Sequence, residues 1–127
     1  MAIRTTTWRP DTCGCVIEYD WDDAVPAAAR VHSFRSCGRC AIHQALAPTD
    51  AAAYALVEAE NKDKNRAVAA AIAAVPRLAG RHDEVAWAFD GARALDIVLP
   101  GGPSAGERTA ARAAATALGL SRAVRVN

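Results

Sequence analysis

The stretch that decides the fold reads Cys13-Gly14-Cys15, followed by 21 residues (16–36) and then by Cys37-Gly38-Arg39-Cys40. A short turn can aim two thiolates at one point, and a second turn supplies the other two. Two such pairs close together in the chain are typical of a structural zinc site, because zinc accepts four soft ligands in a tetrahedron. We therefore predict that Zn²⁺ is bound by Cys13, Cys15, Cys37 and Cys40.

Disulfides, redox cysteines and an iron–sulfur cluster are the alternatives for these four thiols. The N-terminus lacks the apolar segment of a signal peptide, which predicts a reducing, cytoplasmic compartment and favours metal. His43 follows Cys40 by three residues and could replace one sulfur, and His32 is a further candidate ligand. We expect both histidines to lie beside the site or at the surface instead, and Arg39 to offset the negative charge of the thiolates.

The segments around the cysteines have the pattern of short strands. Residues 2–8 are rich in β-branched side chains, and residues 16–21 alternate between apolar and polar. They predict a hairpin with the first cysteine pair at its tip, and residues 30–36 predict a third strand that ends at the second pair. This arrangement resembles a zinc ribbon over about the first 45 residues, and the resemblance implies a fold rather than an activity.

Helical patterns follow. Residues 40–46 predict a short helix, and a long helix begins at Thr49 or Asp50 and ends before Pro76. Acid-before-base pairs at Glu58–Lys62 and Glu60–Lys64 predict a solvated helix centre. One helical face is expected to comprise Tyr54, Val57, Asn61, Asn65, Val68, Ile72 and Val75. Asn61 and Asn65 interrupt it, so they either overhang into water or bind the zinc module or a partner chain.

The C-terminal third has a β-β-α-β pattern. Residues 85–89 and 95–99 predict a hairpin whose loop has an odd length, with Gly91 or Ala92 left-handed, because only that parity puts both apolar sets on one side. A helix follows from Ser104 to Leu118, with a stripe of small residues to pack on the sheet. That stripe comprises Ala110, Ala111, Ala114, Ala117 and Leu118. Residues 122–126 predict a last strand parallel to its predecessor.

Together these segments predict an α+β protein with three parts: a zinc-binding β module (1–47), a central long helix (48–79) and a β-β-α-β module (80–127). No run approaches the roughly 18 apolar residues of a membrane span, so we expect no membrane association. A net charge of +1 gives no bulk attraction to nucleic acid.

The sequence motifs that would indicate nucleotide binding, calcium binding or catalysis are incomplete. Residues 101–106 have the spacing of a phosphate loop, but Glu107 and Arg108 stand where lysine and a hydroxyl residue belong, which predicts a plain strand-to-helix connection. The acidic group Glu18, Asp20, Asp22 and Asp23 lacks the pattern of a calcium loop and predicts a solvated strand edge. Four thiolates would close the zinc coordination sphere, so we expect no catalysis.

The phrase TTTWRPDTCGCVIEYDWDD (5–23), the second cysteine pair and ENKDKNR (60–66) resemble small uncharacterised proteins of tailed phages. The resemblance covers roughly residues 5–70. It rests on Pro10-Asp11-Thr12-Cys13, Cys15, Trp21, Cys37, Cys40, Glu60-Asn61 and Lys64-Asn65. It implies a virion or accessory component.

These observations predict a non-catalytic, zinc-stabilised structural or protein-interaction protein that has a protein partner or forms a homo-oligomer. The alternative is a zinc ribbon that binds single-stranded nucleic acid through a cationic and aromatic segment. That segment comprises Arg30, His32, Phe34, Arg35 and Arg39. Nucleic acid is less favoured because residues 1–29 carry five acids and two bases, a local charge of −3 that cancels the three arginines of residues 30–47.

Overall fold

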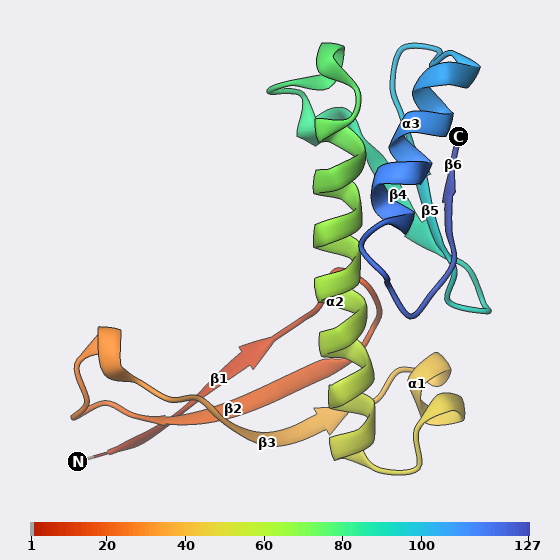
Figure 1. Cartoon of the computed structure of the whole chain (residues 1–127). Helices are drawn as coiled ribbons and strands as arrows, with labels where there is room; N and C mark the ends of the chain where they lie inside the picture. Colours follow the sequence, from red (N-terminus) through yellow and green to blue (C-terminus); the bar gives the residue numbers. More distant parts are fainter. Residues whose placement is uncertain (1) are drawn as a thin grey trace. The chain divides into compact units, whose positions relative to one another are not determined.

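A computed structural model describes residues 2–127 and shows an α+β protein (Figure 1). The chain divides into two compact units, Met1–Asn61 and Lys62–Asn127. The boundary falls inside the long helix α2 (Asp50–Ala73), so each half of this helix belongs to a different unit. The three segments predicted from the sequence set the central helix apart, whereas in the structure its two halves pack into two cores.

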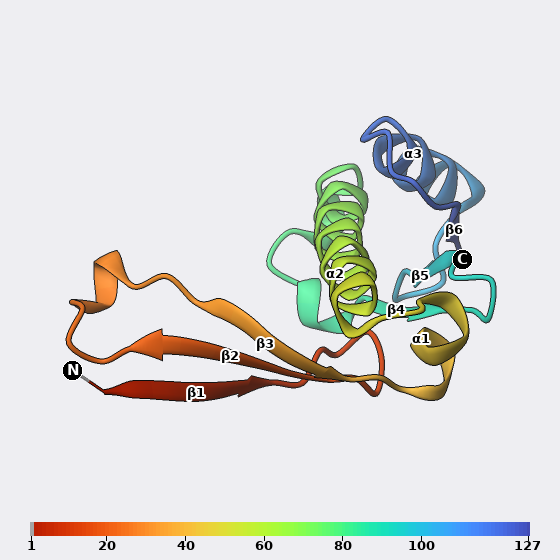
Figure 2. The ribbon, with the colours of Figure 1, turned by 90° about the horizontal axis from the view of Figure 1, so that it is seen from below.

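The N-terminal unit contains an antiparallel sheet in the order β1-β2-β3, whose strands lie side by side in Figure 2. Its strands are β1 (Ile3–Trp8), β2 (Val16–Asp22) and β3 (Ser33–Gly38). The predicted hairpin and third strand are confirmed, with the third strand beginning at residue 33 rather than 30. The acidic residues of β2 were expected at a strand edge, and this expectation is wrong because β2 is the central strand.

The core of the N-terminal unit is small. A 3₁₀ turn, η1 (Ala27–Ala29), precedes β3, and the helix α1 (Ala41–Leu46) follows it. Six buried residues form the core, and two of them are cysteines: Cys15, Ile17, Cys37, Ala47, Ala53 and Val57. A cluster of this size buries little hydrocarbon, so the unit needs a further source of stability.

The buried stripe of α2 differs from the predicted one. It comprises Ala53, Val57, Glu60, Lys64, Ala67 and Ala71, and the buried Val75 follows the end of the helix. The helix therefore turns mostly alanines inward: of the large side chains that guided the prediction, Val57 is buried, whereas Tyr54, Val68 and Ile72 are half-buried. Asn65 is exposed and Asn61 half-buried, while Glu60 and Lys64 are the buried polar residues. The expected solvation of Glu60 and Lys64 is thus wrong.

The C-terminal unit contains a mixed sheet in the order β4-β5-β6. Its strands are β4 (Ala86–Phe89), β5 (Leu95–Val98) and β6 (Val124–Val126), preceded by 3₁₀ turns at η2 (Pro76–Leu78) and η3 (His82–Glu84). β4 and β5 are antiparallel and β6 is parallel to β5, as predicted. The residues between β4 and β5 number five (90–94), which confirms the odd loop, but the left-handed position is Arg93 (φ 65°) rather than Gly91 or Ala92.

The helix α3 (Ala105–Thr116) has the predicted capping box, in which the Ser104 side chain accepts from the Glu107 backbone N–H and the Glu107 side chain accepts from the Ser104 backbone N–H. The chain leaves the helix through Gly119 at φ 68°. Only one residue of the predicted small-residue stripe, Ala111, is fully buried. The other fully buried residue of the helix is Ala115, which was not part of that stripe, so the helix is rotated relative to the expectation.

The core of the C-terminal unit is larger and wholly apolar. It comprises Ala67, Ala71, Val75, Leu78, Val85, Leu95, Ile97, Leu99, Ala111, Ala115 and Val126. Among the described residues, no helix is both long and apolar enough to cross a membrane.

Candidate metal centre

Two connections bring the cysteines of the N-terminal unit together. Cys13 and Cys15 lie between β1 and β2, and Cys40 is the N-cap residue that immediately precedes α1. The connections approach each other closely at Gly14, where a Cβ atom would lie 3.4 Å from the Cβ of Cys40. His43 lies one turn into α1 and is fully buried. Donor atoms of Cys13, Cys15, Cys40 and His43 all lie within 4.8 Å of one another.

The three best-defined separations in this group are short and nearly equal. The Sγ atoms of Cys15 and Cys40 are 3.6 Å apart, and His43 Nδ1 lies 3.4 Å from the first and 3.2 Å from the second. All four cysteines of the chain are free thiols, so these contacts are not disulfides. Three sulfurs and a ring nitrogen converging on one point form a set that can hold a metal ion.

His43 is held on its other side by an acid. Its Nε2 atom shares a hydrogen bond of 2.5 Å with Oε1 of Glu60, and Glu60 is only 2% exposed. A carboxylate that accepts from Nε2 fixes the tautomer with a lone pair on Nδ1, the atom that faces the sulfurs. This orientation of a histidine by a buried carboxylate is the usual support of a metal-binding imidazole.

Burial and hydrogen bonding divide the thiols. Burial raises the pKa of Cys15 and also that of Cys37. Burial acts in the same direction on Cys40, but the hydrogen bond from the His43 backbone and the contacts of the Cys40 sulfur with the His43 ring and with Cys15 outweigh it and lower the pKa of Cys40 to about 6. Cys40 therefore ionises more readily than Cys15 and Cys37, and metals bind the thiolate form.

The predicted site residues fall into distinct places. The structure brings together Cys13, Cys15 and Cys40, with His43 as the fourth donor. Cys37 is buried on β3 next to this group but is not one of the four. Arg39 lies near Cys37, where its charge acts to lower the pKa of that thiol against the larger effect of burial, and its guanidinium donates to the carbonyl of Ala47 at 2.9 Å and lies 3.3 Å from a carboxylate oxygen of Asp50.

Glu60 is the residue that sequence reasoning missed. It was assigned to a solvated helix face because it has charged neighbours and a lysine four residues later. The available signal was the row of alanines and valines that continues through Glu60 at spacings of three and four, from Ala53 and Val57 to Ala67 and Ala71. An acid within such a row needs a buried partner, and His43 provides one.

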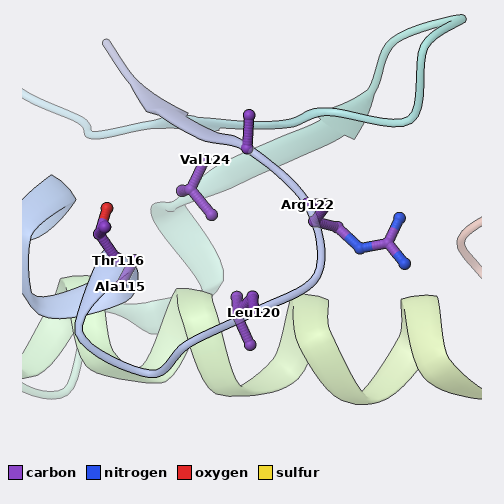
Figure 3. Close-up of a pocket in the computed structure, with 6 residues that line it drawn as sticks. Ala115, Thr116, Leu120, Arg122 and Val124 are labelled. Atoms are coloured by element: carbon purple, nitrogen blue, oxygen red, sulfur yellow. The ribbon is translucent and has the colours of Figure 1, made fainter.

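Two other candidate sites in the C-terminal unit give weaker evidence of a function. In the C-terminal unit a hollow lies between the end of α3 and β6, where the side chains of Leu120 and Val124 face each other and the guanidinium of Arg122 points away (Figure 3). That guanidinium is paired with Asp63 at 2.9 Å. The connection at residues 101–106 leads into α3, and Glu107 is engaged in the helix cap and with Arg77.

Comparison with known proteins gives no relative: no family model, no curated protein and no solved structure matches the chain. The resemblance to small tailed-phage proteins therefore stays a prediction.

Proposed function

We propose that Cys13, Cys15, Cys40 and His43 bind one zinc ion and that this ion has a structural role. Bond lengths of about 2.3 Å to sulfur and about 2.0 Å to nitrogen place the ligand atoms of tetrahedral zinc about 3.5–3.8 Å apart. The separations of 3.2–3.6 Å among Cys15, Cys40 and His43 are close to these values. The observation that carries the proposal is His43, which has Nδ1 among the sulfurs and Nε2 on Glu60.

A site of this kind is closed. Four protein ligands leave no position for water or substrate, so the ion would not activate a reactant. What the ion supplies is a link between the β1–β2 connection and α1, in a unit whose apolar core has only six buried residues. The proposal is therefore a non-enzymatic protein stabilised by zinc.

An interaction role accompanies this structural one. The helix α1, which carries the ligand His43, exposes Ile42 at 42% and Leu46 at 50%, one turn apart. Large apolar side chains displayed together on a metal-fixed helix suit contact with another protein chain. We propose a protein partner or a second copy as the occupant, and a virion or accessory component as the setting that the sequence resemblance suggests.

Cys40→Ser and Cys37→Ser form a matched pair that tests the site. Both remove one sulfur from the same unit, but only Cys40 belongs to the proposed ligand set. We expect the native protein and Cys37→Ser to contain one zinc per chain by elemental analysis, and Cys40→Ser to contain much less. Cobalt substitution should give the absorption of tetrahedral thiolate coordination in the first two proteins only.

Loss of metal from Cys37→Ser with retention in His43→Gln would contradict this ligand set and support the four cysteines instead. A protein that takes up neither zinc nor cobalt would contradict the metal site altogether.

Sedimentation velocity of the zinc-loaded protein, with Leu46→Ser for comparison, tests the interaction role. An oligomer that dissociates on this substitution would support self-association through α1.

A further inference from the structure

The two faces of the N-terminal sheet differ in chemistry. Side chains alternate along a strand, so residues one apart lie on opposite faces. Glu18 and Asp20 lie on one face, where the guanidinium of Arg35 is 3.9 Å and 3.4 Å from their carboxylates. Tyr19 and Trp21 lie on the other face. The acids and aromatics that alternate in the sequence are therefore separated by the thickness of the sheet.

The second face, named here the aromatic face, is a continuous row of rings and cations. It comprises Arg4, Trp8, Tyr19, Trp21, Arg30 and His32. The ring of His32 lies 6.2 Å from both Tyr19 and Trp21, and Tyr19 lies 6.5 Å from Trp8. The row crosses from β1 through β2 to the segment that leads into β3, so it is longer than any single side-chain pair.

Hydrogen bonds and a cation hold the outer part of this row in place. The guanidinium of Arg30 lies 4.2 Å from the centre of the Trp21 ring, and its Nε donates to the carbonyl of Val25. The indole N–H of Trp21 donates to Thr6 at 2.7 Å. These hydrogen bonds hold the side chains of Trp21 and Arg30 in place, so the binding surface is pre-organised before a ligand arrives.

The first turns of α2 cover only one end of the sheet within this unit. Tyr54 stacks on Phe34 with ring centres 4.7 Å apart and meets Tyr19 edge-on at 5.8 Å. Beyond Tyr19, Trp21 is half-buried and His32 is exposed. The acids on this side include Asp23, which is paired with Arg4 at 3.0 Å, and Glu58, which accepts a hydrogen bond from Tyr54 and lies near Tyr19.

We propose that the aromatic face binds single-stranded nucleic acid, with bases stacked on Trp21, His32 and Tyr19 and phosphates near Arg30. Sites of this kind combine aromatic platforms, which accept any base, with cations along the backbone path. The argument against nucleic acid from the sequence was that acids cancel the arginines. The structure reduces this cancellation on the aromatic face, because Glu18 and Asp20 project from the opposite face and engage Arg35 there, while Asp23 is paired with Arg4 and Glu58 with Tyr54.

The residues of the aromatic face differ from the cationic and aromatic segment that was predicted from the sequence to bind nucleic acid. Arg30, His32 and Phe34 contribute to it or adjoin it, whereas Arg35 lies on the opposite face and Arg39 is engaged near α1. Trp21 and Tyr19 join from β2. The inference is independent of which metal the protein holds, since none of these side chains is a proposed ligand.

Arg30→Ala and Arg35→Ala provide a matched test, because each removes one arginine from the N-terminal unit: Arg30 belongs to the aromatic face and Arg35 lies on the opposite face of the sheet. The probes are fluorescein-labelled oligo(dT) and oligo(U) of about 20 nucleotides, longer than the ~4–16 nucleotides of comparable sites. Fluorescence anisotropy with the full metal-loaded chain at low salt is expected to show binding that weakens as salt rises. Trp21→Leu and Arg30→Ala should each weaken it about ten-fold, and Arg35→Ala less than about two-fold.

Trp21→Phe serves as the second variant, because it keeps a stacking ring and should retain most of the affinity if Trp21→Leu loses it. Quenching of tryptophan fluorescence on binding would support the proposal further. Equal losses for Arg30→Ala and Arg35→Ala, tighter binding of a duplex than of single strands, or no binding to either oligonucleotide would overturn the proposal.

Discussion

The two units of this protein reach stability by different means. The core of the C-terminal unit has eleven buried residues, all apolar, whereas the core of the N-terminal unit has six, two of them cysteines. The smaller unit instead buries a histidine and a glutamate that bond each other beside three sulfurs. Hydrophobic periodicity therefore explains most of the C-terminal unit, which also buries Lys64 and Arg93 against aromatic rings, whereas the N-terminal unit depends on the chemistry of its buried polar atoms.

Metal removal is the strongest test of this difference. A chelator should unfold the N-terminal unit and spare the C-terminal one, at a cost of several kcal/mol, because ligand binding and folding are coupled in small metal sites. Backbone amide signals in a ¹⁵N–¹H NMR spectrum would report this, with those of Ile17 and Cys37 collapsing and those of Leu95 and Ile97 persisting. A spectrum left unchanged by complete metal extraction would contradict the division.

A core substitution in the other unit is the counterpart. Ile97→Ala deletes a fully buried side chain of β5, and we expect a loss of about 2–5 kcal/mol in the free energy of unfolding. Metal content should stay at the native level, because Ile97 belongs to the apolar core of the C-terminal unit. Urea titration followed by circular dichroism, with elemental analysis of the same samples, checks both statements. Loss of metal from this variant would show that the units do not fold separately.

The smallest expected effect concerns Glu60. Glu60→Gln keeps the shape of the side chain but removes the charge that orients His43, and the expected result is a loss of about 10–100-fold in metal affinity. Asn65→Ala, an exposed change on the same helix, is the control and should leave the affinity unaltered. Competition with a chromophoric chelator measures both. Equal affinities for the native protein and Glu60→Gln would show that the buried carboxylate does not support the site.

Sequence reasoning predicted most of the architecture because its signals are local. The parity of the loop between Phe89 and Leu95 follows from which side chains must share a face, and the capping box follows from Ser104 and Glu107 alone. The left-handed residue in that loop was missed, since the backbone placed Arg93 there although a glycine was available two residues earlier.

The candidate site was predicted less completely. Ligand spacing identified the converging cysteines, but the choice between Cys37 and His43 depends on how β3 and α1 meet, which spacing does not specify. Helix phase was the second difficulty. Large side chains were assumed to point inward, whereas α2 buries alanines, so its inward polar positions became Glu60 and Lys64 instead of Asn61 and Asn65.

The uninterrupted course of α2 through the boundary at Asn61 and Lys62 has a practical consequence. Cutting the chain there would strand about four carbonyl groups on one fragment and four amide groups on the other, each without its helical partner. Neither half is then a ready-made module for recombination or for study alone. A fragment meant to preserve the cysteine-rich half would have to carry additional turns of the helix beyond residue 61.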